Sequence, residues 1–89
     1  MDILENNFNN AINIVNNLTK RPNDDELLEI YGFFKQAKFG DNNNNKPLFF
    51  NFKQIKKWKA WNKCKNLKRD DSKQKYIDLA IKLYNKYKE

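Results

Sequence analysis

The chain contains only two glycines and two prolines among 89 residues, and this scarcity limits the folds that it can adopt. A β-rich fold needs many tight turns, which glycine and proline most often build. The chain draws instead on Lys, Glu, Gln and Leu, which favour helices. It is also too short to bury two hydrophobic cores. The sequence therefore predicts an all-α fold in a single domain over residues 1–89.

Apolar residues recur at intervals of three and four along four stretches, which is typical of amphipathic helices. The predicted helices span residues 3–18, 24–39, 51–65 and 70–87. Asn23 and Glu26 predict a capping box at the start of the second helix, and Gly40 predicts its end. The next loop, residues 41–50, contains four consecutive asparagines, which we interpret as a solvated insertion without a function of its own. Together these elements predict a four-helix bundle.

Each helix has an apolar face that we expect to contribute to the core. The first helix presents Leu4, Phe8, Ala11, Ile12, Val15 and Leu18. The faces of the second and fourth helices comprise Leu27, Leu28, Tyr31, Phe34 and Lys38, and Tyr76, Ile77, Ala80, Ile81, Leu83, Tyr84 and Tyr87. On this pattern Tyr76 is a core ring with its hydroxyl at the rim.

Residues suited to catalysis or metal binding are scarce. The chain has no histidine, one cysteine (Cys64) and one serine (Ser72), and its two glycines cannot form a glycine-rich phosphate loop. A Cys/His metal site is excluded, and Cys64 cannot form an internal disulfide. We therefore predict a binding protein, not an enzyme, with no cofactor of its own.

No segment of the sequence predicts export or membrane insertion. The acidic start lacks the basic and apolar regions of a secretory signal, and the longest apolar run, Leu48-Phe49-Phe50, is too short to span a bilayer. Asp2 excludes N-myristoylation, and the last residues contain no prenylation motif. We expect a soluble, cytoplasmic protein and, most simply, a monomer.

The net charge of +7 is divided unequally along the chain. Residues 1–34 carry a net charge of −4, whereas residues 35–89 carry +11. Such a field steers anions toward one side of a molecule. From charge alone, the partner could be an anionic small molecule, a nucleic acid or a membrane surface. A membrane surface is the less favoured partner, because the apolar faces of the predicted helices are needed to form the core.

Both tryptophans lie in a lysine-rich stretch, residues 54–62. Trp58 and Trp61 share one face of the predicted helix, and Lys53 and Lys57 form a neighbouring basic row. This arrangement suits a ligand with a flat ring and phosphates. It equally suits a helix that buries its tryptophans and exposes its lysines, so these residues specify no function when taken singly.

Taken in order, a set of motifs spans nearly the whole chain with a consistent spacing. They are Phe8, Ala11, Leu18, the turn 21–24, YGFFKQAKFGD at 31–41, Pro47, KWKAWN at 57–62 and Tyr76-Ile77. In this order they closely resemble the acyl-CoA-binding protein family. The resemblance implies a four-helix bundle that binds long-chain acyl-CoA esters in a bowl on its surface.

The resemblance also implies roles for individual residues. Tyr31, Lys35 and Lys57 would hold the ribose 3′-phosphate. Tyr76 would contact the CoA head group. Lysines suit this task because charge-assisted hydrogen bonds to phosphate are strong. The two tryptophans would be mainly structural or line the site from beneath.

The remaining implied residues surround this head-group region. Lys53 and Arg21 would lie near the rim. Leu27 and Leu28, with Phe34 nearby, would line the path of the acyl chain. Shielding that chain from water would contribute roughly 0.8 kcal/mol per methylene group. Binding should therefore tighten with chain length until the groove is filled.

Three positions depart from the family pattern. Asn16 stands where the family usually has a lysine, which would remove one phosphate contact. Arg21 replaces a lysine before the proline, which keeps the charge but changes the geometry. The usual Gly-Thr-Ser-like entry to the fourth helix is Asn66-Leu67-Lys68 here, and Asp70 or Asp71 could supply its cap.

The sequence thus predicts a non-catalytic protein that binds, buffers and transports medium- and long-chain acyl-CoA esters in fatty acid metabolism. The alternative is a basic helical nucleic-acid-binding domain. For the leading prediction we expect acyl-CoA as the ligand and no nucleic acid as a partner. Transient contact with a membrane or with an acyl-CoA-using enzyme stays open.

Overall fold

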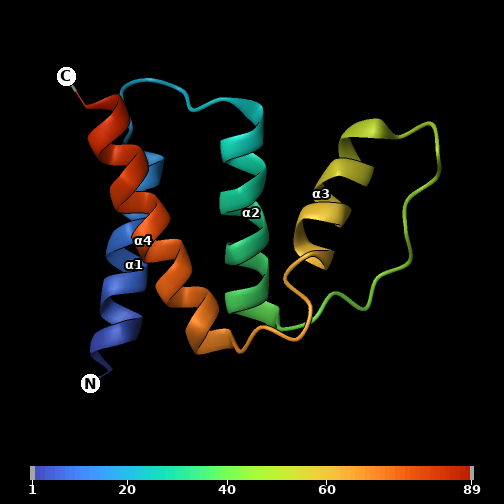
Figure 1. The fold of residues 1–89 in the computed structure, drawn as a ribbon, viewed down its shortest axis with the longest axis horizontal. Helices are drawn as coiled ribbons and strands as arrows, with labels where there is room; N and C mark the ends of the chain where they lie inside the picture. The colour runs from blue at the N-terminus through green and yellow to red at the C-terminus, as the bar shows by residue number, and fades with distance from the viewer. Residues whose placement is uncertain (1, 89) are drawn as a thin grey trace.

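The computed structural model describes residues 2–88, which form four α-helices (Figure 1). They are α1 (Ile3–Asn16), α2 (Asp24–Phe39), α3 (Phe52–Asn62) and α4 (Arg69–Tyr87). No strand occurs within the described residues, so the predicted all-α class is confirmed. α1 and α3 end earlier than predicted, whereas α2 has the predicted bounds. The predicted domain extends one residue beyond the described range at each end.

The helices lie side by side in the order α1, α4, α2, α3 (Figure 1). α4 packs against both α1 and α2, and α2 packs against α3. The principal extents of 38 × 32 × 14 Å describe a flat, open form of the predicted bundle. Among the described helices, α3 packs against α2 alone. No helix of residues 2–88 is long and apolar enough to cross a membrane.

The core lies between α1, α2 and α4 and is rich in aromatic rings. Phe8 of α1 meets Tyr76 of α4 edge to face, with ring centres 5.2 Å apart, and stacks on Phe34 of α2 at 6.4 Å. Such aromatic pairs add stability beyond the area that they bury. The buried hydrophobic residues of this core are Phe8, Ala11, Ile30, Ala37, Tyr76, Ile77, Ala80 and Leu83.

The predicted core faces are right for α1 but need correction for the other long helices. On α4, Ile81 and Tyr84 are about half exposed, so its stripe is narrower than predicted. On α2, the core residues are Ile30 and Ala37, whereas Lys38 is exposed. The physical reason is that α2 lies between α4 and α3. Two of its sides are covered, and a single apolar stripe cannot describe both.

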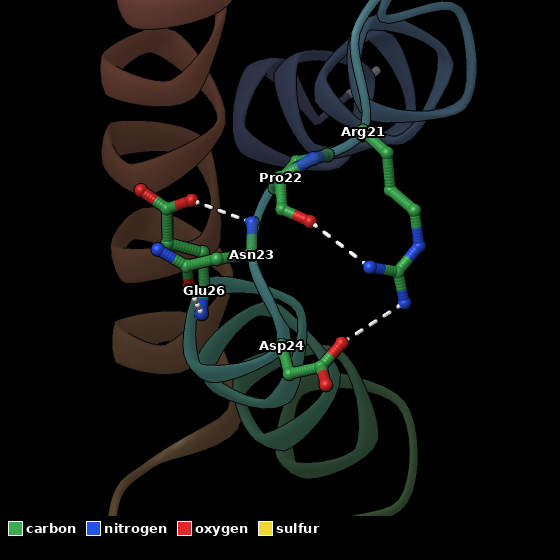
Figure 2. Close-up of polar contacts among 5 residues, drawn as sticks. All are labelled: Arg21, Pro22, Asn23, Asp24 and Glu26. Atoms are coloured by element: carbon green, nitrogen blue, oxygen red, sulfur yellow. Dashed lines mark hydrogen bonds and ion pairs between the residues drawn. The ribbon is translucent and has the colours of Figure 1, made fainter.

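The start of α2 is capped as predicted. The Asn23 side chain accepts the Glu26 N–H at 2.8 Å, and the Glu26 carboxylate accepts the Asn23 N–H at 2.9 Å (Figure 2). This capping box satisfies two backbone donors that the first helical turn leaves unpaired. At the other end, Gly40 has φ +77°, a conformation that favours glycine and ends the helix.

Glu26 also joins the start of α2 to the end of α4. Its carboxylate accepts hydrogen bonds from the Lys86 ammonium, at 2.7 Å, and from the Tyr87 hydroxyl. The Lys86 hydrogen bond, followed by those from Tyr87 and Asn23, lowers the pKa of Glu26 from 4.5 to about 2. The charged form of this carboxylate is therefore strongly favoured in the folded protein.

The start of α4 is not capped by Asp70 or Asp71, so that expectation is wrong. The N-cap position is Lys68, which makes no side-chain capping hydrogen bond. The start of α4 is tied instead to α2. The Arg69 guanidinium donates to the carbonyl oxygens of Ala37 and Lys38, at 3.1 and 2.9 Å. The buried Ser72 hydroxyl donates to the Phe33 carbonyl at 2.8 Å, a structural role for the one serine.

The turn between α3 and α4 is fixed on the end of α2 by a second set of hydrogen bonds. The Gln36 side-chain amide donates to the Asp41 carboxylate, at 2.9 Å, and to the Leu67 carbonyl, at 2.8 Å. Asp41 also accepts the backbone N–H of Asn66, whose φ is +74°. The Gln36 hydrogen bond, followed by that from Asn66, holds the pKa of Asp41 below its ordinary value. These bonds fix the point where the chain leaves α3.

The asparagine run is solvated at Asn43, Asn44 and Asn45, as expected, but it also contacts α3, which the sequence did not indicate. Asn42 is buried, and its side chain donates to the Trp58 carbonyl at 3.3 Å. In return the Trp58 indole N–H donates to the Asn44 carbonyl at 2.8 Å. The loop between α2 and α3 is therefore hydrogen-bonded to α3 and helps to position it.

Candidate functional site

A tyrosine and two lysines from two helices meet where α2 faces α3; we call Tyr31, Lys35 and Lys57 the cationic cluster. The Lys57 ammonium lies 5.1 Å from the centre of the Tyr31 ring, and the Lys35 ammonium lies 6.0 Å from it. Within residues 2–88, neither ammonium forms an ion pair with a carboxylate. The cluster therefore offers uncompensated positive charge beside a phenol, which suits an anionic group with a ring.

Two further rings form the base of the cluster beneath Lys35. The Lys35 ammonium lies 4.4 Å from the centre of the Phe39 ring and 4.8 Å from that of Trp61. Trp61 is 7% exposed, and its indole N–H donates to the Gly40 carbonyl at 2.8 Å. Phe39 was missed from the sequence, although its place four residues after Lys35 puts both on one helix face.

The distance between the two helices at the cluster is set by Gly32, which sequence reasoning also missed. A Cβ atom at this position would lie 2.5 Å from the carbonyl oxygen of Ala60 on α3, which is a clash with backbone. Only glycine allows α2 and α3 to approach this closely. Because Tyr31 precedes Gly32, this contact brings the Tyr31 ring within reach of Lys57. The signal in the sequence was a glycine in a helix interior.

Tyr76 and Phe34 lie in the aromatic core rather than in the cationic cluster. Tyr76 is 3% exposed, and its ring centre is 5.2 Å from that of Phe8 and 6.3 Å from that of Phe34. Burial raises the pKa of Tyr76 to about 12. Its hydroxyl is therefore a neutral hydrogen-bonding group at physiological pH.

The two predicted rim residues lie at the starts of helices. Lys53 is exposed in the first turn of α3, one turn before Lys57. Arg21 lies in the turn before α2, where its guanidinium donates to the Pro22 carbonyl, at 3.4 Å, and to Asp24, at 3.1 Å (Figure 2). Both side chains are accessible, but Arg21 would exchange its Asp24 ion pair for any ligand phosphate.

An open trough of about 1020 Å³ runs between α2 and α3 and reaches the start of α4. Acidic residues of α2 and basic residues of α3 form its two walls, and apolar side chains form part of its lining. The apolar lining residues are Leu28, Phe33, Ala60, Cys64 and Leu67. Leu28 is thus the predicted ligand residue that lines the trough, whereas Leu27 is half-buried outside it. The trough depends on the spacing of two helices and had no signal in the sequence.

Cys64 is half-buried in this trough. Its thiol donates to the Ala60 carbonyl at 3.7 Å. Burial, with a smaller contribution from Glu29, raises the pKa of the Cys64 thiol. A thiol with a raised pKa is a poor nucleophile, so Cys64 acts here as a small apolar lining residue.

The geometry thus defines an all-α protein with a basic aromatic cluster on the α2–α3 pair and a partly apolar trough between the same two helices, lined by other residues. Residues 5–80 match the family model described as "Acyl CoA binding protein". The chain belongs to the acyl-CoA-binding protein family.

Relatives and solved structures agree with this assignment. The chain is 46% identical to the acyl-CoA-binding protein homolog of Drosophila melanogaster, over 90% of this chain and 93% of the relative. It is 42% identical to the acyl-CoA-binding protein of Saccharomyces cerevisiae, over 90% and 92% of the two chains.

The fold is also similar to that of solved structures. The crystal structure of Oryza sativa acyl-CoA-binding protein 2 matches with a TM-score of 0.89 at 25% identity, covering 93% of this chain and 92% of that chain. The solution structure of the yeast acyl coenzyme A binding protein matches with a TM-score of 0.73 at 41% identity, covering 92% and 95%. The alternative of a nucleic-acid-binding domain gains no support from these likenesses.

Proposed function

We propose that this protein binds, buffers and transports medium- and long-chain acyl-CoA esters. The proposal rests on the convergence of Tyr31 and Lys35 from α2 with Lys57 from α3, whose ammonium lies 5.1 Å from the Tyr31 ring centre. These residues come from two helices that meet at Gly32, so the arrangement exists only in the folded chain. A ligand that carries both phosphates and a flat ring matches it.

In this proposal the cationic cluster holds the ribose 3′-phosphate. Lys35 and Lys57 donate charge-assisted hydrogen bonds to phosphate oxygens, which are the strong kind. The Tyr31 hydroxyl is a further donor, and the neighbouring rings offer faces for stacking. Lys53 and Arg21 contribute positive charge at the rim. Tyr76, which is 3% exposed in the core, would contact the CoA head group only after its hydroxyl becomes accessible. Asn16 is exposed at the end of α1 and leaves one site of phosphate contact without a lysine.

The acyl chain would lie along the apolar lining of the trough, entered past Leu28. A path of this kind shields methylene groups from water at roughly 0.8 kcal/mol each, so affinity rises with chain length. The resemblance also assigns Leu27 and Phe34 to this path; Leu27 is half-buried outside the trough, and Phe34 packs in the aromatic core. The trough is open and lined by lysines, which keeps the ligand accessible to an enzyme that receives it.

The further parts of the proposal concern the protein as a whole. It acts without chemistry of its own and without a cofactor, as a cytoplasmic monomer and a single acyl-CoA-binding domain over residues 1–89. Contacts with a membrane or with an acyl-CoA-using enzyme are transient, as a carrier requires.

Titration calorimetry with palmitoyl-CoA, free CoA and palmitate tests the ligand class. Palmitoyl-CoA should bind far more tightly than either fragment, because only the ester occupies both the cluster and the trough. Similar weak binding of palmitoyl-CoA and CoA would contradict the proposal. A gel shift with RNA and DNA at moderate salt should show no complex; a stable complex would favour the nucleic-acid alternative.

A further inference from the structure

Four large apolar side chains protrude into solvent where the chain enters α3; we call residues 48–52 the aromatic turn. The exposed fractions are 67% for Leu48, 82% for Phe49, 64% for Phe50 and 72% for Phe52. Solvent-exposed rings are common one at a time, but a contiguous group of them marks an interaction surface. None of the four lies in the aromatic core or lines the trough.

The aromatic turn is held in a defined shape rather than left as a free segment. The Asn51 N–H donates to the Leu48 carbonyl at 2.9 Å, and the Asn51 side chain caps α3 through the Gln54 N–H. The Phe49 and Phe50 rings meet edge to face, with centres 5.7 Å apart. The fold therefore keeps these rings outside the core although hydrophobicity favours their burial.

Lysines flank the aromatic turn on both sides. Lys46 precedes it, and Lys53 and Lys56 follow it on α3; all three are exposed. Within the described residues, none of these three forms an ion pair. Apolar rings bordered by lysines are complementary to a bilayer with anionic headgroups, because the rings enter the interface while the ammonium groups meet lipid phosphates.

We propose that the aromatic turn docks the protein on anionic lipid bilayers. The turn lies at the outer edge of the molecule, before α3 and away from α1 and α4 (Figure 1). It forms a projection and not a groove, which suits insertion into a fluid interface. Membrane binding was disfavoured from sequence because the apolar faces of the helices were expected to form the core. The rings of the aromatic turn lie outside those faces.

The inference rests on the proposed function for its purpose, since docking would bring the binding site to the membrane from which an acyl-CoA is taken or to which it is delivered. Lys53 of the predicted rim directly follows Phe52 of the turn. A docked molecule would therefore hold the rim of the site near the lipid headgroups.

Co-sedimentation with vesicles, without any acyl-CoA, tests the docking itself. The wild-type protein should bind phosphatidylcholine vesicles that contain phosphatidylserine, bind pure phosphatidylcholine more weakly, and lose binding as salt rises. Phe49→Ser with Phe50→Ser should weaken binding to the mixed vesicles by about tenfold or more, because the rings no longer enter the interface. Lys46→Gln with Lys56→Gln should remove most of the preference for phosphatidylserine.

The matched control is Ile3→Ser with Ile81→Ser. These residues are 75% and 49% exposed on α1 and α4, so the control removes exposed apolar surface far from the turn. It should bind vesicles like the wild type. Urea unfolding should show that both double variants keep wild-type stability. No binding of the wild type to mixed vesicles, or an equal loss in both double variants, would overturn the proposal.

Palmitoyl-CoA titration separates this inference from the proposed function. The Phe49→Ser and Phe50→Ser double variant should keep wild-type affinity for palmitoyl-CoA while it loses vesicle binding. If the wild-type protein binds vesicles but not palmitoyl-CoA, the proposed function is wrong and the docking proposal stands. If it binds palmitoyl-CoA but not vesicles, the docking proposal alone is wrong.

Discussion

The molecule has two regions that are built differently: the three-helix core of α1, α2 and α4, and the α3 side with its preceding loop. In the core, Phe8, Ala37 and Ala80 are fully buried, and the Lys73–Glu5 ion pair at 2.7 Å joins α4 to α1. In α3, Trp61 is the buried residue, and half of the other residues are exposed. The core relies on apolar burial, whereas α3 is held by hydrogen bonds from its tryptophans and by one close backbone contact.

This difference separates stability from binding. The core excludes water and can be read as a scaffold, because its side chains contact one another. The α3 side supplies Lys57, one wall of the trough and the aromatic turn. Its lysines and exposed rings therefore lie outside the buried core. Loss of a core ring should therefore unfold the protein, whereas a change on α3 should alter its interactions.

The largest effect should come from the core. Phe8→Ala removes a ring that is fully buried against Tyr76 and Phe34, and it should cost about 3–5 kcal/mol of the free energy of unfolding. Phe49→Ala removes the same ring from the aromatic turn and should change stability by less than about 0.5 kcal/mol. Urea unfolding followed by circular dichroism measures both. If both variants lost the same free energy of unfolding, the proposed distinction between the core and the α3 side would be wrong.

The second effect should appear in binding without a change in stability. Lys57→Ala should weaken palmitoyl-CoA binding by about 10- to 100-fold, because a hydrogen bond between charged groups contributes about 1.5–3 kcal/mol. Binding of free palmitate should change little, since palmitate lacks the phosphates. Lys82→Ala, an exposed lysine of α4, is the control and should leave the Kd unchanged. Equal losses for both ligands would contradict a phosphate role for Lys57.

The third effect should reach both regions, because it lies at their boundary. Gly32→Ala places a Cβ 2.5 Å from the Ala60 carbonyl oxygen, so α3 must move away from α2. Overpacking of this kind costs about 1–3 kcal/mol of stability. Because Tyr31 and Lys57 then separate, palmitoyl-CoA affinity should fall as well. Calorimetry at a temperature where the variant is fully folded measures the second loss; unchanged affinity there would show that the cluster does not depend on this contact.

The smallest effect should depend on pH. The folded pKa of Glu26 is about 2, below its ordinary 4.5, so its contribution to stability is complete above pH 4.5. That contribution is lost progressively as the pH falls from 4.5 toward 2, because the unfolded chain then binds the proton first. Glu26→Gln should flatten the dependence of the urea midpoint on pH in this window. If the urea midpoint of the variant still fell with pH as steeply as in the wild type, the acid sensitivity would come from other carboxylates.

Much of the scaffold could be predicted from sequence because its causes are local. The capping box depends on Asn23 and Glu26 three residues apart, and the end of α2 depends on Gly40 alone. The entry to α4 failed as a prediction because Arg69 and Ser72 reach carbonyl oxygens of α2 that lie more than thirty residues away. No spacing within the helix could indicate partners at that separation.

The candidate site divides in the same way. Motif order alone identified Tyr31, Lys35 and Lys57 as a set, and the fold brings them together across two helices. Phe39 beneath Lys35, the contact of Gly32 with Ala60, and the hydrogen bonds of the asparagine loop were not anticipated. Each of these depends on where α3 lies against α2.

The sequence by itself determined the four helices, the caps of α2, the charge asymmetry and the family, because these follow from residue type and from spacing along the chain. Only the tertiary structure decided which side of α2 faces the core, how the trough opens, and that the rings of residues 48–52 stay in solvent. The physical reason is that burial and proximity arise between segments, and α2, packed on two sides, has no single pattern that reports both.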